Sequence, residues 1–172
     1  MPIQPCEVPP HSFLNRYKIG DGYADCYVTE VPGAIAQAAF IEAFYTSPLF
    51  KIERALLKIF AGKSATDADV RQLALGNAET FSAWNVEDQT RSELLLADMS
   101  GRTRSWLMVS PVEVNGGAPR TLLYFGSAVL PRQRADGQRP SLGWMFVALL
   151  GFHRLYSRLL LRAASRRVRA SG

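Results

Sequence analysis

The chain has 172 residues, of which 20% are charged and 48% hydrophobic, and its net charge is +5. These proportions are typical of a globular chain with one hydrophobic core, and they exclude disordered, collagen-like and coiled-coil classes. The charge is unevenly distributed, because six arginines and none of the acidic residues lie at or beyond Ser141. We expect a single domain over residues 1–172, in which the proline-rich residues 1–20 form an extended arm.

The two cysteines, Cys6 and Cys26, are too few for a disulfide framework, and no CxxC motif or Cys/His cluster indicates a metal site. The N-terminus lacks the basic start and apolar run of a signal peptide. The longest apolar run, residues 142–152, is about half the length that crosses a bilayer. We therefore expect a cytoplasmic protein that holds no metal and no other cofactor.

The first part of the chain predicts one strand followed by three helices. Residues 23–31 are rich in β-forming side chains and predict the strand. Helical spacing and start signals predict the helices over residues 34–45, 48–61 and 66–76. Those start signals include Ser47 before Pro48, and Thr66 followed three residues later by Asp69, as in a capping box.

From residue 78 the hydrophobic period becomes two, which predicts an antiparallel meander. Its strands are expected at residues 81–86, 92–98, 104–114 and 121–130. The polar residues 87–91 should join the first two strands. Asn115 and Gly116 should form the hairpin tip between the last two, because these residue types accept positive φ. With the strand at residues 23–31, about five strands are expected.

One long helix is predicted over residues 141–168, with Ser141 as its N-cap, after a polar loop at residues 132–139. Its first half, residues 142–152, is entirely apolar or glycine and should be buried nearly all round. Its second half places four arginines at intervals of four, namely Arg154, Arg158, Arg162 and Arg166. This spacing predicts an amphipathic half-helix with the arginines along one side and the leucines on another.

The order of strand, helices, meander and long helix gives an α+β fold and resembles the helix-grip fold of START-like proteins. In that fold the C-terminal helix lies across the mouth of a curved antiparallel sheet. More specifically, residues 83–109 (AWNVEDQTRSELLLADMSGRTRSWLMV), 122–132 (LLYFGSAVLPR) and 151–164 (GFHRLYSRLLLRAA) resemble an uncharacterised bacterial domain of the START-like (SRPBCC) superfamily. That domain occurs alone or fused to short-chain-dehydrogenase-like NAD(P)-binding proteins.

The resemblance implies a concave interior between sheet and helix, and such cavities favour apolar small molecules. Side chains whose strand parity or helix face could point into it are Trp84, Arg104, Trp106, Tyr124, Trp144 and His153. Each also has a structural interpretation. The tryptophans could be core aromatics, Tyr124 could pack half-buried, and His153 could be a hydrogen-bonded structural histidine and not an acid–base catalyst.

Arg104 shares its parity with Trp106, so it could point toward the core, where it would need a carboxylate partner. Asp98 and Glu93 are the nearest candidates along the chain, and a surface cross-strand pair is favoured over an internal pair that binds a polar ligand head. The sequence contains no GxSxG, phosphate-binding or zinc-protease motif. No catalytic residue can therefore be assigned from a known motif.

Three functions follow. The first is binding of an apolar small molecule in the cavity without turnover. The second is a cyclase- or aromatase-like enzyme in the same cavity, as known in the superfamily. The third is a membrane-surface or interaction protein with a filled core, whose arginines contact anionic lipid. Nucleic acid is not expected as a partner, because no exposed aromatic residues are interleaved with the basic stripe.

Overall fold

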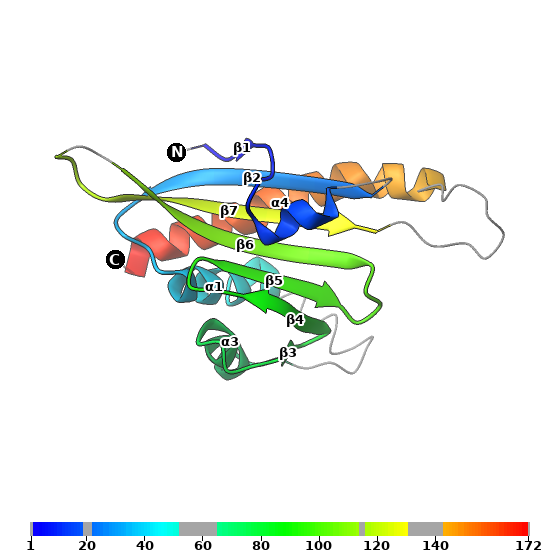
Figure 1. Cartoon of the computed structure of the whole chain (residues 1–172), viewed down its shortest axis with the longest axis horizontal. Coiled ribbons are helices and arrows are strands. Elements are labelled where there is room, and N and C mark those ends of the chain that lie inside the picture. The colour runs from blue at the N-terminus through cyan, green and yellow to red at the C-terminus, as the bar shows by residue number, and fades with distance from the viewer. Residues whose placement is uncertain (1, 19–21, 52–64, 114–115, 131–142, 172) are drawn as a thin grey trace.

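The computed structural model describes residues 2–18, 22–51, 65–113, 116–130 and 143–171, and within the C-terminal helix the side chains of residues 154–170 (Figure 1). Its strands are β1 (Gln4–Pro5), β2 (Tyr23–Pro32), β3 (Thr80–Phe81), β4 (Trp84–Gln89), β5 (Glu93–Asp98), β6 (Thr103–Val112) and β7 (Arg120–Val129). Its helices are the 3-10 helix η1 (Phe13–Tyr17) and the α-helices α1 (Gln37–Tyr45), α3 (Asp67–Ala74) and α4 (Gly143–Ser171).

The described strands form one antiparallel sheet of seven strands in the order β1-β2-β7-β6-β5-β4-β3. The predicted pairing of the last two long strands is confirmed, since β6 pairs with β7 from Thr103↔Val129 to Val112↔Arg120. Gly116 has a φ of +72°, as the predicted turn requires. Asn115 lies outside the described residues.

The bounds predicted for the first hairpin of the meander are wrong. Residues 81–86 do not form one strand, because the chain reverses at Ser82, whose φ is +56°, and separates β3 from β4. Residues 87–89, predicted as a turn, belong to β4. A bulge between Val86 and Asp88 adds one residue to that strand and shifts the alternation of its side chains.

The predicted start signals of two helices agree with the structure. Thr66 and Asp69 form the predicted capping box at the start of α3, each side chain accepting from the other residue's backbone N–H. Residues 48–51 are helical, and the Ser47 hydroxyl accepts from the Phe50 N–H at 3.3 Å. The remainder of the helix predicted over residues 48–61, Ser141 and the polar loop at residues 132–139 lie outside the described residues.

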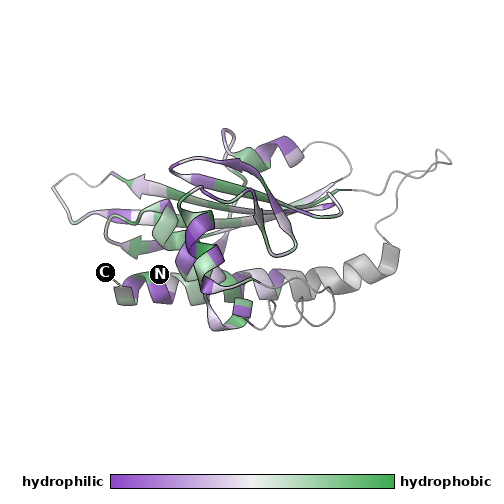
Figure 2. Ribbon diagram, turned by 90° about the horizontal axis from the view of Figure 1, so that it is seen from below, coloured by the Kyte–Doolittle hydropathy of each residue, from purple (hydrophilic) through white to green (hydrophobic). Residues whose placement is uncertain are grey.

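The sheet separates two layers (Figure 2). The long helix α4 and helix α1 cover one face, which we call the helix face, and η1 lies on the opposite face, the arm face. Alternate residues of each strand divide between these layers. On β7, for example, Leu123 and Phe125 enter the helix-face core, whereas Ala128 enters the arm-face core. The α+β class, with a long C-terminal helix on one side of the sheet, is confirmed.

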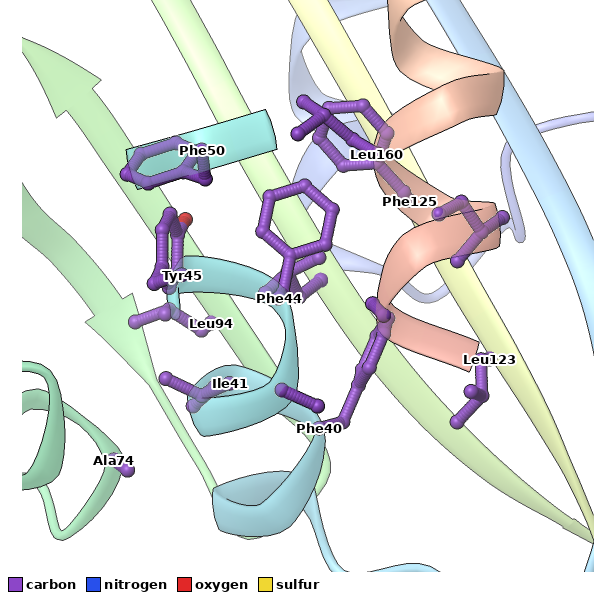
Figure 3. Packing of buried hydrophobic residues seen from close by; sticks show 14 of the residues in the cluster. Phe40, Ile41, Phe44, Tyr45, Phe50, Ala74, Leu94, Leu123, Phe125 and Leu160 are labelled. Carbon is purple, nitrogen blue, oxygen red and sulfur yellow. The ribbon is translucent and has the colours of Figure 1, made fainter. Parts of the chain in front are cut away.

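The helix-face core is built around an aromatic cluster from α1 and its neighbours (Figure 3). The Phe44 ring lies 4.9 Å from that of Phe125 on the sheet and 5.1 Å from that of Tyr45. Tyr45 in turn contacts Phe50 and Phe81, with ring centroids 4.8 and 5.1 Å apart. The described part of this interior is therefore occupied by side chains.

The N-terminal residues, expected as a mostly extended arm, contain the short strand β1 and the 3-10 helix η1. They wrap around the β2 edge of the sheet, so that Ile3 packs against the helix-face core whereas Val8 and Leu14 belong to the arm-face core. Leu14 is fully buried, and its Cδ2 lies only 2.5 Å from the position that a Cβ on Gly126 would take. The absence of a side chain at Gly126 lets η1 approach the sheet.

Candidate functional site

The described half of α4 has one buried stripe and one wide exposed face. Its buried residues recur at helical spacing and are Ser157, Leu160, Leu161, Ala164, Ser165 and Val168. Leu155 and Leu159 do not join them, and remain 57% and 43% exposed. The prediction that leucines and arginines occupy different sides is therefore wrong for these two leucines, each of which lies three residues before an arginine on the same face.

We call this surface the arginine–leucine face. Its members are Leu155, Arg158, Leu159, Arg162, Arg166 and Arg169. Together with Pro2, Ile3 and Ser165 they line an open groove of about 550 Å³ between α4 and the first residues of the chain. The N-terminus lies beside α4 in Figure 2, consistent with this groove. An apolar strip bordered by cations is thus presented on one side of the molecule.

The arginines of α4 differ in what they contact. Arg154 Nε donates to the Tyr23 hydroxyl at 3.1 Å, and the Arg158 guanidinium lies 6.0 Å from the Tyr27 ring centre. Arg169 donates to the Glu30 carbonyl at 3.1 Å. For the side chains of Arg162 and Arg166, the structure shows no hydrogen bond or ion pair to any described residue. These two are therefore the arginines most available to an external anion.

A polar cluster on β2 and β7 supports the start of this face. Asp25 accepts from the Ser127 hydroxyl at 2.6 Å and from the Tyr23 hydroxyl at 3.2 Å. Burial, together with the negative charge of Asp25, raises the pKa of Tyr27 to about 12. Burial also raises the pKa of Tyr23, against the opposing effect of Arg154. Both phenols are therefore neutral near pH 7 and present their rings to the arginines.

The sequence-predicted site residues do not meet in one cavity. Trp84 is half-buried and packs on the helix-face core, as does Val86 of the same strand. Trp106 and Tyr124 lie in or against the arm-face core, with ring centres 6.2 Å apart. Arg104 lies on the arm face too, with its guanidinium 4.6 Å from the Tyr17 ring centre. Arg104, Trp106 and Tyr124 therefore point away from α4, and for these three residues the expectation of a place in a cavity beneath it is wrong.

The predicted partners of Arg104 are also wrong. Its Nε pairs with Glu87 Oε2 at 2.6 Å, and Glu87 lies on this side because it alternates with Trp84 and Val86, which pack on the helix-face core. Asp98 instead accepts from the backbone N–H groups of Arg102 and Thr103 and closes the β5–β6 turn. The Glu87 pairing was missed because residue 87 was predicted in a turn, whereas it belongs to β4. The result is a structural ion pair that holds η1, because Tyr17 also donates to Glu87.

Trp144 and His153 lie on α4, but their side chains are outside the described set, so their proposed ligand contacts stay predictions. The same holds for a cavity against the apolar half of α4. Within the described residues, no three or more His, Cys, Asp or Glu side chains form a group that could hold a metal ion. None of the helices, over the residues described, is long and apolar enough to span a membrane.

A scan against protein-family models finds no matching family, and a search of curated proteins finds no significant match. Functional inference therefore depends on the surface chemistry of the chain itself. The arginine–leucine face is the described feature whose composition differs most from that of an ordinary solvated helix surface, because it combines exposed apolar side chains with unopposed positive charge.

Proposed function

We propose that the chain binds reversibly to anionic membrane surfaces through the arginine–leucine face. One observation carries this proposal: Leu155 and Leu159 are exposed between arginines on the same side of α4. An interfacial helix inserts apolar side chains just below the lipid headgroups while its cations contact the phosphates. The region from Ser141 to the C-terminus has no acidic residue that would oppose this contact.

The expected strength is moderate. Each arginine near an anionic surface contributes about 1 kcal/mol at physiological ionic strength. A fully buried leucine contributes about 1.5–3 kcal/mol, and Leu155 and Leu159 would bury only their exposed parts. These contributions sum to a few kcal/mol, which is typical of a peripheral protein that exchanges between membrane and solution.

A bilayer accounts for this surface better than a nucleic acid. Charge complementarity alone would serve both, but the exposed leucines need an apolar environment that a phosphate backbone does not offer. The cytoplasmic leaflet is rich in anionic lipid. We therefore include a cytoplasmic location in the proposal.

The helix-grip fold of START-like proteins belongs to the same proposal. It is supported by the order of elements, by the antiparallel sheet and by the packing of α4 and α1 on one face. A second candidate function is binding of an apolar small molecule against residues 142–152 of the sequence, which contain no polar side chain. Native mass spectrometry of protein purified from its host tests this candidate, because a retained small molecule would appear as added mass.

Vesicle sedimentation tests the membrane proposal. The protein should sediment with vesicles that contain phosphatidylserine and much less with pure phosphatidylcholine. Raising the salt concentration should weaken binding, because screening reduces the contribution of the arginines. Equal recovery with both vesicle types, or no sedimentation with either, would contradict the proposal. Binding to duplex DNA or to an acidic protein, with no binding to vesicles, would assign the face to those partners instead.

A further inference from the structure

The N-terminal segment crosses the β2 edge of the sheet at Cys6. The pairs Gln4↔Val28 and Pro5↔Tyr27 place Cys6 opposite Cys26, and the Cys6 N–H donates to the Cys26 carbonyl at 3.0 Å. The two Sγ atoms are 3.2 Å apart, and both cysteines are free thiols. A pair of thiols thus lies where the chain passes from the helix face to the arm face.

We propose that Cys6 and Cys26 form a redox-active dithiol, which closes a reversible disulfide by exchange with an anionic low-molecular-weight disulfide of the glutathione type. This inference is independent of membrane binding. The disulfide would fasten the N-terminal segment to β2.

The geometry needs little change to form the bond. Residues directly opposite each other in an antiparallel pair have Cα atoms about 4.5–5.5 Å apart, which lies within the range that a disulfide spans. The sulfur atoms must approach by about 1 Å to reach the S–S bond length of ~2.05 Å. Because the backbone hydrogen bond already fixes the pairing, side-chain rotation can supply this movement.

The two thiols have different environments, which sets their roles. Cys6 is half-buried, whereas Cys26 is only 3% exposed. The hydrogen bond with the Cys26 thiol lowers the pKa of Cys6, against the opposing effect of burial. The same contact and burial raise the pKa of Cys26. Cys6 is therefore the thiol that ionises first and reacts first with an external disulfide.

A concavity of about 380 Å³ leads to the thiols. Besides Cys6 and Cys26, its lining includes Arg154 and Arg158 from α4. Asp25 also lines it, but its carboxylate accepts hydrogen bonds from Ser127 and Tyr23. Two exposed guanidinium groups at the mouth favour the approach of a negatively charged reactant. This favours a peptide disulfide with free carboxylates over a neutral one.

The exchange balances without a further oxidant. The Cys6 thiolate attacks one sulfur of the small disulfide, whose S–S bond breaks, and one small thiolate leaves and takes up a proton. Cys26 then loses its proton to water and attacks the Cys6 sulfur, which releases the second small thiol. The protein loses two electrons and two protons overall, and the small disulfide gains both as it becomes two thiols.

The first test compares the folded protein with the denatured chain. Wild type is equilibrated in glutathione redox buffers with and without urea, acid-quenched, alkylated and digested with trypsin. We expect a disulfide linking peptides 1–16 and 19–51, formed in the folded protein with an effective thiol concentration about 30-fold or more above that in urea. The proposal would be overturned by equal effective thiol concentrations in the folded protein and in urea, or by glutathione adducts in place of the linked peptides. Cys26→Ser should yield only the mixed disulfide on Cys6.

The second test addresses the class of reactant. The variant Arg154→Gln/Arg158→Gln should react at least about twofold more slowly with oxidised glutathione at low ionic strength. Its rate with the neutral bis(2-hydroxyethyl) disulfide should match that of wild type. Arg71→Gln/Arg91→Gln changes the net charge equally at exposed positions elsewhere and should alter neither rate. Equal slowing with both disulfides, or with neither, would overturn the assignment of an anionic reactant.

Discussion

The indole Nε1 of Trp106 donates a hydrogen bond to Oε2 of Glu93, 2.8 Å away, on the face of the sheet opposite α4. The same oxygen accepts from the Phe13 N–H at 2.9 Å. One carboxylate oxygen therefore joins β5, β6 and η1. Because Trp106 is fully buried, its N–H depends on this acceptor.

Removing the carboxylate should destabilise the protein. Glu93→Ala leaves the Trp106 N–H buried without its acceptor, and we expect the free energy of unfolding to fall by about 2–3 kcal/mol. Urea denaturation measures this change, with the exposed Glu79→Ala as the control. In a double-mutant cycle with Trp106→Phe, the two losses should be less than additive. Full additivity would mean that the hydrogen bond contributes nothing specific.

Gly126 should tolerate no side chain. An added Cβ would lie 2.5 Å from Leu14 Cδ2 and 2.8 Å from the Asp25 carbonyl oxygen. We expect Gly126→Ala to lower the free energy of unfolding by about 1–3 kcal/mol, as overpacking typically does. The additional change Leu14→Ala removes the first clash but not the second, so the double variant should lose less than the sum of the single losses. If Gly126→Ala is as stable as wild type, η1 does not pack on the sheet as described.

The two sides of α4 should respond differently to truncation. Leu161 is fully buried, and Leu161→Ala should lower the free energy of unfolding by about 2–5 kcal/mol. Arg162→Ala on the exposed side should change it by ~0–1 kcal/mol. Thermal and urea unfolding of both variants give the comparison. Similar losses would show that α4 is rotated relative to the sheet.

Asp98 should make stability depend on pH. Burial raises its pKa, but hydrogen bonds from the Ser100 hydroxyl and from the backbone N–H groups of Thr103, Arg102 and Ser100 lower it below its ordinary value overall. A lowered folded-state pKa stabilises the protein above the unfolded value of about 3.9, and this stabilisation is lost as pH falls through the folded value.

Asp98→Asn should therefore be less stable than wild type at pH 7, and the difference should shrink as the pH is lowered below about 4. Urea midpoints measured between neutral and acidic pH test this, with the exposed Glu113→Gln as a reference. A difference that does not change with pH would mean that the charged form of Asp98 is not favoured by folding.

The sequence allowed the strand and helix order to be predicted because those signals are local. The Thr66–Asp69 capping box and the hairpin of β6 and β7, with Gly116 between the two strands, depend only on neighbouring residues, and the structure contains both. The β4 bulge at Val86 left no comparable signal. It places Asp88 opposite Leu95 on the arm face, beside Glu87. The partner of Arg104 was missed for another reason, because Glu87 was predicted in a turn and not in a strand.

The candidate site was less predictable for a related reason. The alternation of side chains along β6 predicted that Arg104 and Trp106 share a face of the sheet. It did not predict which face α4 covers, because both layers contain aliphatic and aromatic residues. Spacing alone could not show which leucines of α4 are exposed, because Leu155 and Leu161 each lie three residues from Arg158, yet Leu155 is exposed and Leu161 is fully buried. The rotation of α4 against the sheet decides between them, and the sequence does not specify that rotation.

Vesicle binding by paired variants shows whether the arginine–leucine face binds anionic membranes. Leu155→Ser/Leu159→Ser should weaken binding to phosphatidylserine vesicles about tenfold or more, because it removes the apolar contact. Arg162→Gln/Arg166→Gln should weaken it by about 2 kcal/mol, or roughly 30-fold, and should reduce its salt dependence. Both variants should keep the wild-type free energy of unfolding within about 1 kcal/mol, because the altered side chains are exposed.

The matched controls for this measurement are Leu75→Ser, at another exposed leucine, and Arg71→Gln/Arg91→Gln, which has the same net charge as the arginine variant. We expect both controls to bind vesicles as wild type does and both variants of the arginine–leucine face to bind weakly. If the arginine variant and its charge-matched control lose equal affinity, and the leucine variant loses none, binding depends on net charge alone and the arginine–leucine face is not the membrane-binding surface.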